Sequence, residues 1–264
     1  MNAPSPHSTA QSTPLLDLSV VIIAFNEEDQ LPRCLKSLPP GVEVIVLDSM
    51  STDRTTIIAS EFGAQVYQRP FTNFAEQKNA ALAYGTRKWV LAVDADEELS
   101  PELSAKLPEL ISNSEANAYR LDRRLVFMGR RMRFGKTKDK PLRLFLRGAG
   151  QYKGSIHEEY VPRAGKTFFL SNAVLWHYSY RDLNDYFARF NRYTSAIAEQ
   201  HAAKGKKPSF LSHVLRPWFE FINRYIFRLG FLDGYPGYTY ALISSLYTFV
   251  KYAKLFEARR GHKQ

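Results

Sequence analysis

The strongest constraint on the fold is an alternation of short apolar runs with helix-like segments in the first half of the chain. The runs 18–25, 42–47, 64–67 and 89–93 read as strands, and the first is the apolar, β-branched pattern of a strand buried on both faces. A strand–helix–strand–helix order is typical of a mostly parallel sheet flanked by helices. The sequence therefore predicts an α/β fold.

Helix start and stop signals lie between these strands. Leu31, Leu35 and Leu38 share one face of a predicted helix over 27–38. Ser51 or Thr52 can cap a second helix that runs to Phe62, and Gly63 suits the position after its end. A third helix is predicted over 74–84, ended by Gly85, and Ser100, Pro101 and Glu102 read as the N-cap and first turn of a fourth.

Carboxylates follow three of the predicted strands. They are Glu27 and Glu28 after the first, Asp48 and Asp53 after the second, and Asp94 and Asp96 after the fourth. Ligands of parallel sheets bind beyond the carboxyl ends of the strands, where unpaired carboxylates would be costly to bury. For Asp53 alone, a helix cap is the simpler interpretation.

A dinucleotide-binding Gly-x-Gly-x-x-Gly after the first strand is absent, as is a P-loop. This favours a nucleotide held by side chains, with its phosphates bridged to a metal ion. Asp94-Ala95-Asp96 suits that task, because alternate carboxylates can reach one hard cation and leave positions open for diphosphate oxygens. The single cysteine, Cys34, excludes an intramolecular disulfide and is expected to be a buried structural thiol.

Charge is distributed unevenly along the 264 residues. Residues 1–118 carry 8 Lys and Arg against 16 Asp and Glu, whereas residues 119–264 carry 28 against 10. The acidic half is suited to a divalent metal and the basic half to an anionic partner. A merely solubilising basic surface is the alternative.

Several motifs together resemble the family 2 inverting glycosyltransferases, and more narrowly their lipopolysaccharide inner-core β-1,4-glucosyltransferase subgroup. The family pattern lies in Val20–Glu28, Val46–Thr55 and Val93–Glu97. The subgroup pattern lies in Gln77–Asn79, Gly154–Glu158, Asn191–Thr194 and Leu232–Gly237. The resemblance implies a GT-A fold, Rossmann-like, and a nucleotide-diphospho-sugar donor.

The resemblance also implies roles for individual residues. Backbone groups around Ala24 and Phe25, with Asp48, would contact the nucleobase, and Glu27 would lie near the ribose. Lys78 would lie near the diphosphate, Asp94 would contact the ribose or donor sugar, and Asp96 would ligate Mg²⁺ or Mn²⁺.

The catalytic base is expected in the acceptor region. The chain lacks the Glu-Asp pair common there in the family and offers His157-Glu158-Glu159 instead. We expect Glu158 to be the base, with His157 orienting it or the acceptor. His177, after an apolar run, is either a third metal ligand or an ordinary hydrogen-bonded histidine.

The second half reads as an acceptor-binding and membrane-associating module. Residues 120–147 are rich in Arg and Lys, which suits either a solvated loop or a site for a phosphorylated or carboxylate-bearing acceptor. A helix is predicted over 182–204, followed by a hinge.

The segments 210–228 and 237–251 are rich in aromatic residues and flanked by basic residues, as in helices at a membrane interface. The alternative is that these segments pack on the catalytic domain or on a second subunit. Pro217 predicts a kink.

The predicted organisation is a disordered tail over 1–14, a nucleotide-sugar-binding α/β half over 15–118, an acceptor-binding half over 119–205 and an amphipathic helical extension over 206–264. The resemblance implies transfer of a sugar, glucose from UDP-glucose, to a heptose of an anionic lipid-linked lipopolysaccharide core. It also implies a peripheral, cytoplasmic location on the inner face of the bacterial inner membrane. No nucleic-acid partner is expected, because the sequence contains no recognised nucleic-acid-binding motif. The alternatives are a metal-dependent nucleotidyltransferase and a non-catalytic basic module for membrane surfaces.

Overall fold

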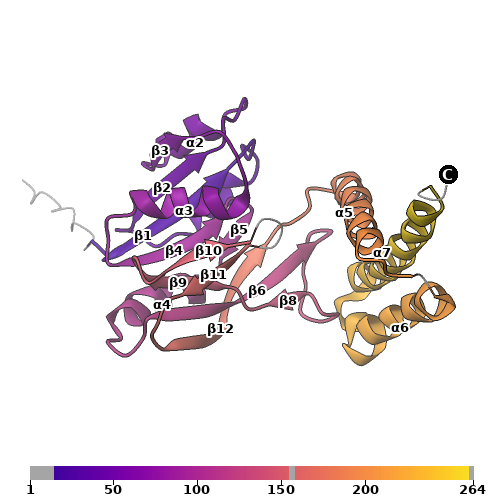
Figure 1. Ribbon diagram of the computed structural model, residues 1–264. Coiled ribbons are helices and arrows are strands. Elements are labelled where there is room, and N and C mark those ends of the chain that lie inside the picture. The colour runs from indigo at the N-terminus through magenta and orange to yellow at the C-terminus, as the bar shows by residue number, and fades with distance from the viewer. Residues whose placement is uncertain (1–14, 155–157, 208, 262–264) are drawn as a thin grey trace, which may run out of the picture. The chain divides into compact units, whose positions relative to one another are not determined.

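The computed structural model describes residues 15–154, 158–207 and 209–261 (Figure 1). The predicted tail over 1–14 and the predicted site residue His157 lie outside the described residues. The described chain forms two compact units. The first contains residues 15–121 and 141–174, and the second contains residues 122–140 and 175–261.

The first unit is built on four parallel strands in the order β3 (Gln65–Gln68), β2 (Glu43–Asp48), β1 (Leu18–Ala24) and β4 (Trp89–Asp94). All four strands lie where the sequence predicts them. The register pairs Ala24 with Asp48 and Ile23 with Asp94, so the carboxyl ends of β1, β2 and β4 meet at one edge of the sheet. The predicted α/β class is therefore confirmed, and so is the predicted clustering of strand ends.

Two of the four predicted helices begin where the sequence predicts them. The helix α3 (Phe74–Tyr84) is capped by Asn73 and ends before Gly85. The helix α4 (Pro101–Ser112) begins after Ser100, whose hydroxyl accepts a hydrogen bond from the backbone N–H of Leu103 at 3.2 Å.

The other two helices, α1 (Leu31–Lys36) and α2 (Thr55–Glu61), are shorter than predicted. The predicted start at Glu27 is wrong because the N–H of Glu27 donates to Thr55 Oγ1 at 2.8 Å, which joins this stretch to the loop after β2. The predicted caps Ser51 and Thr52 are also wrong, because α2 begins only at Thr55. Asp53 acts at this helix start instead, since its Oδ1 accepts from the N–H of Thr55 at 2.9 Å.

The sheet continues beyond β4 with β9 (Leu142–Leu146), which pairs antiparallel with both β4 and β6 (Ala118–Phe127), and β9 and most of β6 fall in the segment read from the sequence as a basic loop or acceptor site. After β6 the order continues with β12 (Thr167–His177) and β5 (Glu97–Leu99). The short strands β7 (Arg130–Arg131) and β8 (Lys138–Asp139) pair with β6. A hairpin of β10 (Gly150–Lys153) and β11 (Glu159–Pro162) forms a separate sheet.

The second unit is mainly helical. Its helices are α5 (Leu183–Ala203), the π-helix η1 (Leu211–Leu215), α6 (Arg216–Ile222), the π-helix η2 (Asn223–Phe227), the short 3₁₀-helix η3 (Gly230–Asp233) and α7 (Gly234–Gly261). The predicted start of α5 is confirmed, with Asp182 as its N-cap. The helix type changes from π to α immediately before Pro217, where the sequence predicts a kink or break. The helix α7 packs against both α5 and α6.

Two motifs of the predicted subgroup pattern have structural roles in this unit. Lys254 of α7 donates to the carbonyl of Asn191 at 2.9 Å and to Thr194 Oγ1 at 3.0 Å, which ties α7 to α5. The buried Asp233 accepts the N–H of Phe134 at 2.8 Å. A Cβ at Gly237 would lie 2.0 Å from the carbonyl oxygen of Gly230, so no larger residue fits there.

Among the described residues, no helix combines the length and the apolar character needed to cross a bilayer.

Candidate active site

The loops that follow β1 and β2 are bound to each other at the sheet edge. The N–H of Asn26 donates to Ser51 Oγ at 2.8 Å, and Asn26 Oδ1 accepts the N–H of Thr52 at 2.9 Å. The carboxylate of Asp48 lies under this junction, fully buried, and accepts the N–H of Ser51 at 2.9 Å and Gln68 Nε2 at 3.2 Å. Asp48 thus fixes the shape of the loop into which its strand leads.

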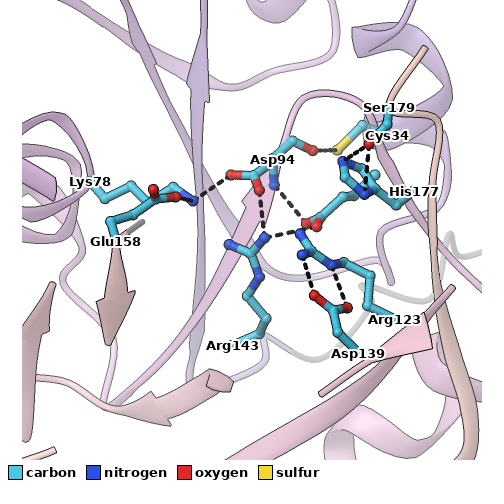
Figure 2. A network of polar contacts seen from close by, with 10 residues as sticks. Cys34, Lys78, Asp94, Arg123, Asp139, Arg143, Glu158, His177 and Ser179 are labelled. Carbon is cyan, nitrogen blue, oxygen red and sulfur yellow. Dashed lines mark hydrogen bonds and ion pairs between the residues drawn. The ribbon is translucent and has the colours of Figure 1, made fainter. Parts of the chain in front are cut away.

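The centre of the site is a chain of ion pairs at the end of β4 (Figure 2). Lys78 of α3 places its ammonium 2.8 Å from Asp94 Oδ1 and 3.0 Å from Glu158 Oε1. In Figure 2 the ammonium lies between the two carboxylates. The predicted residues Lys78, Asp94 and Glu158, which lie up to 80 positions apart in the chain, therefore meet in one cluster.

Arg143 of β9 completes this network. Its Nη2 pairs with Asp94 Oδ2 and with Glu97 Oε1, the latter at 2.8 Å, and Glu97 Oε2 accepts the N–H of Asp94 at 2.9 Å. Both Arg143 and Glu97 are buried. The carboxylate of Asp94 is therefore held between two cations, one on each oxygen.

The electrostatics follow from this geometry. Burial alone would raise the pKa of Asp94, but Arg143 and Lys78 hold that pKa well below its usual range. Burial alone would lower the pKa of Lys78, but the neighbouring Asp94 raises it above its ordinary value. Lys78, Asp94 and Arg143 are therefore all charged at neutral pH.

The three residues of the Gln77–Asn79 motif have separate tasks on α3. Gln77 Nε2 donates to Ser49 Oγ at 3.0 Å, which links the helix to the loop after β2. Asn79 exchanges two hydrogen bonds with the backbone of Tyr152, one at 2.9 Å and one at 2.8 Å. Because Tyr152 lies in β10, this pair fixes α3 beside the hairpin that leads to Glu158. Lys78, between the two anchors, is thereby aimed at Asp94.

The remaining predicted residues lie around the same sheet edge. Ala24 is the last residue of β1 and is buried, Phe25 after it is exposed, and Glu27 is half-buried. Asp96 is half-buried in the turn between β4 and β5. These positions are compatible with the roles that the resemblance implies, which remain predictions.

Asp96 is the candidate ligand for a metal ion at this edge. Within the described residues no group of three or more His, Cys, Asp or Glu side chains is placed to hold one. The donor set on offer is carboxylate oxygen from Asp96, beside Asp94. That set fits Mg²⁺ or Mn²⁺ bound mainly through substrate phosphates and water, the arrangement that Mg²⁺ favours.

Cys34 and His177 were also singled out in the sequence, and whether His177 ligates a metal stays a prediction. Cys34 is fully buried, as predicted, and burial together with Glu97 and Asp96 raises the pKa of its thiol, so it stays protonated and unreactive. His177 belongs to the second unit, where Ser179 Oγ lies 3.0 Å from its Nδ1.

Arg143 and Glu97 are the residues whose importance the sequence analysis missed. In the sequence, Arg143 was only one of the basic residues of the segment 120–147, whereas in the structure it neutralises Asp94 and Glu97. The available signal was the apolar pattern around it, Leu142, Leu144, Phe145 and Leu146, which marks a buried strand that contains one arginine.

Comparison with known proteins identifies the class. The model of the family described as "Glycosyl transferase family 2" matches residues 19–173, more than half of the chain. This range contains the entire ion-pair network. The chain belongs to glycosyl transferase family 2 and is a glycosyltransferase, which confirms the resemblance and the GT-A-like α/β fold that it implied.

Individual relatives extend over nearly the whole chain. The lipopolysaccharide core biosynthesis glycosyltransferase LpsC of Rhizobium meliloti (strain 1021) is 31% identical over 258 residues, which is 92% of this chain and 93% of LpsC. An uncharacterized glycosyltransferase of Rickettsia bellii (strain RML369-C) is 30% identical and covers 91% of this chain and 86% of its own length.

Among solved structures, glucosyl-3-phosphoglycerate synthase from Mycobacterium tuberculosis, in complex with Mg²⁺ and UDP, is 29% identical, with a TM-score of 0.36, over 40% of this chain and 43% of that chain. S. aureus TarS 1-349 is 14% identical, with a TM-score of 0.49, over 93% of this chain and 92% of that one.

The network predicts a large effect of removing Arg143 on stability. In Arg143→Met, Asp94 and Glu97 lose a buried cation, so we expect the free energy of unfolding at pH 7 to fall by about 3–5 kcal/mol. The exposed Arg147 at the end of the same strand is the matched control, and Arg147→Met should change it by less than about 0.5 kcal/mol. Urea unfolding measures both.

The same comparison has a pH dependence with a defined sign. A carboxyl with a depressed pKa stabilises the folded protein above its unfolded pKa, and this contribution is lost as the pH falls through the folded value. The difference between wild type and Arg143→Met should therefore be constant near neutral pH and shrink once the pH falls below the ordinary aspartate value of 3.8. A difference that does not change down to pH 2 would contradict the assignment.

Proposed function

We propose that this glycosyltransferase is an inverting enzyme of lipopolysaccharide core assembly. It moves a sugar, glucose from UDP-glucose, onto a heptose of a lipid-linked core oligosaccharide. The similarity to LpsC over almost the full length of both chains supports the core oligosaccharide as acceptor. The motifs shared with the inner-core glucosyltransferase subgroup support glucose and heptose.

The observation that carries the proposal is the network in which Lys78 lies between Asp94 and Glu158. An inverting transfer needs a base for the acceptor hydroxyl and positive charge for the leaving nucleoside diphosphate. The network offers a carboxylate on one side of Lys78 and the strand-end carboxylates on the other. A diphosphate oxygen that reached Lys78 would compete with Glu158 for its ammonium and free that carboxylate to accept a proton.

The reaction that these residues support is a single displacement. A hydroxyl oxygen of the acceptor forms a bond to the anomeric carbon while the bond from that carbon to the diphosphate oxygen breaks. The hydroxyl proton passes to Glu158, and the electron pair of the broken bond leaves on UDP. Asp94, fixed by two cations, hydrogen-bonds the ribose or the donor sugar and orients the anomeric carbon.

A divalent cation fits the charge balance of the site. The cluster places the carboxylates of Asp94, Glu97 and Glu158 around the cations Lys78 and Arg143. A diphosphate adds further negative charge beside Asp96. When bound there, Mg²⁺ or Mn²⁺ would supply Lewis-acid stabilisation of the leaving diphosphate.

The second unit supports a membrane-bound acceptor. The stretch from η1 to the start of α7 exposes many large apolar side chains, which we call the apolar face. They are Phe210, Leu211, Leu215, Trp218, Phe219, Ile222, Ile226, Phe227, Phe231, Leu232 and Tyr235. The unit also carries 21 Lys and Arg against 8 Asp and Glu. An apolar surface with surplus positive charge suits an anionic membrane surface, where each basic residue contributes about 1 kcal/mol.

The transfer itself is tested with purified protein, Mn²⁺, UDP-glucose and lipopolysaccharide truncated at the inner core. We expect a product heavier by one glucose, and Glu158→Gln should lower kcat by about 10²–10⁴-fold because the base is lost. The neighbouring Glu159 is exposed and serves as the control, since Glu159→Gln should keep the wild-type rate. Failure to form product with any of a panel of nucleotide sugars would overturn the proposal.

Metal and nucleotide binding are tested without turnover by thermal unfolding. UDP should raise the Tm of the wild type more in the presence of Mn²⁺ than in its absence, because a ligand stabilises the state that it binds. Asp96→Asn should lose this Mn²⁺-dependent increment. Glu102→Gln, which removes an exposed carboxylate at the start of α4, should retain it. An unchanged increment in Asp96→Asn would exclude Asp96 as the ligand.

Membrane attachment is tested by co-sedimentation with vesicles. The wild type should bind vesicles containing phosphatidylglycerol and bind pure phosphatidylcholine at least tenfold more weakly. Trp218→Asp combined with Phe227→Asp places charge in the apolar face and should abolish binding to both. Phe62→Asp changes an exposed aromatic residue of the first unit and should have no effect. Undiminished binding of the double variant would contradict the assignment of this face.

A further inference from the structure

A polar, open-sided cavity in the second unit is lined mainly by residues of α5, α6, η2 and α7. Its volume is about 580 Å³, within the range typical of sites for small molecules. Six tyrosines contribute to its lining. They are Tyr180, Tyr186, Tyr193, Tyr240, Tyr247 and Tyr252. The glycosyltransferase chemistry above makes no use of any of these residues.

The cavity has a surplus of positive charge. Arg216, Arg224 and Lys251 line it together with one carboxylate, Glu220. Glu220 accounts for Arg224, whose Nε lies 2.7 Å from Glu220 Oε1. Arg216 instead donates to the hydroxyl of Tyr252, and Lys251 Nζ lies 4.9 Å from the centre of the Tyr252 ring. Within the described part of the chain, neither of these two cations pairs with a carboxylate.

The tyrosines present unused hydrogen-bonding groups beside these cations. Among the described residues, the hydroxyls of Tyr180, Tyr186 and Tyr247 have no hydrogen-bond partner. Burial raises the pKa of Tyr180 and Tyr186 further above neutrality, so both hydroxyls remain protonated and able to donate. A lining of aromatic faces with hydroxyl groups at their edges is suited to a sugar ring, which has apolar C–H faces and a polar rim.

From this combination, we propose that the cavity binds a phosphorylated saccharide. Arg216 and Lys251 recognise the phosphate, and the tyrosine rings and hydroxyls recognise the sugar. An arginine fork is well matched to phosphate oxygens, and a lysine adds a second point of charge. The inference rests on the proposed function only in naming the source: a phosphate-bearing sugar of the core oligosaccharide, rather than a free sugar phosphate.

The proposal is tested by isothermal titration calorimetry of the full chain without donor nucleotide. The probes are deacylated inner-core oligosaccharide with its phosphates, the same oligosaccharide after dephosphorylation, and glucose 6-phosphate. We expect the wild type to bind the phosphorylated oligosaccharide at least tenfold more tightly than the dephosphorylated one. Equal affinity for the two would overturn the proposal. The glucose 6-phosphate arm identifies the source, because binding at least as tight as that of the oligosaccharide would point to a free sugar phosphate.

Variants locate the binding in the cavity. Arg216→Gln combined with Lys251→Gln should weaken binding of the phosphorylated oligosaccharide at least tenfold. Lys204→Gln combined with Lys207→Gln removes the same charge from exposed positions outside the cavity and should stay within twofold of wild type. Equal losses in the two double variants would show unspecific attraction and overturn the site. Tyr247→Phe keeps the ring and removes only a hydroxyl, so it should fold normally and weaken binding several-fold.

The test is separable from the proposed function. Glu158→Gln should bind the phosphorylated oligosaccharide like the wild type although its transfer is about 10²–10⁴-fold slower. Transfer without any cavity-dependent binding would remove the inference alone. Cavity-dependent binding without transfer from any nucleotide sugar would remove the proposed function alone.

Discussion

The active-site half of this molecule depends on the neutralisation of Asp94. A carboxylate at the end of a buried strand is stable only when cations or hydrogen-bond donors compensate for its lost hydration. Here Arg143 reaches one oxygen and Lys78 the other. The compensation must come from outside the parallel strands, since their own side chains at this depth are apolar. This requirement joins α3, β4 and β9 at a single point.

Once Asp94 is fixed, the surrounding site has little freedom. If Lys78 moved away, the carboxylate of Asp94 would lose one of its two cations. The helix that carries Lys78 is also held on one side by Ser49 and on the other by Tyr152. Glu158, paired with the same ammonium, is thereby brought to the strand edge from a position 80 residues beyond Lys78. A site of this kind is preorganised, because its charges are positioned by folding before any substrate arrives.

How much of this could be predicted depends on how local each signal is. The four parallel strands and the carboxylates that follow them were predicted correctly because apolar runs and strand-end positions are visible within a few residues. The shortened α1 was not, because its first residues bind the side chain of Thr55 from another loop. Arg143 was not singled out because its partners lie 46 and 49 positions away, and the sequence alone does not distinguish it from the other arginines of 120–147. The β-strands of that segment were missed for a related reason, since frequent Arg and Lys residues conceal their alternation.

In the second unit, α6 and η2 depart from the usual pattern of a helix in water, which exposes polar residues and buries apolar ones. These helices contribute to both the polar cavity and the apolar face. Along α6 and η2, Arg216, Glu220 and Arg224 follow one another at intervals of four and line the polar cavity together with Phe219, and Arg216 is exposed like Trp218, Ile222 and Phe227. A helix that exposes several large apolar side chains gains stability where they meet something other than water. The π-helical turns on both sides of α6 are the kind of irregularity that often accompanies binding sites. An apolar environment outside and a charged, hydroxyl-rich ligand inside are therefore complementary demands of one helix. An acceptor whose lipid part lies in the membrane and whose phosphorylated sugar projects from it satisfies both.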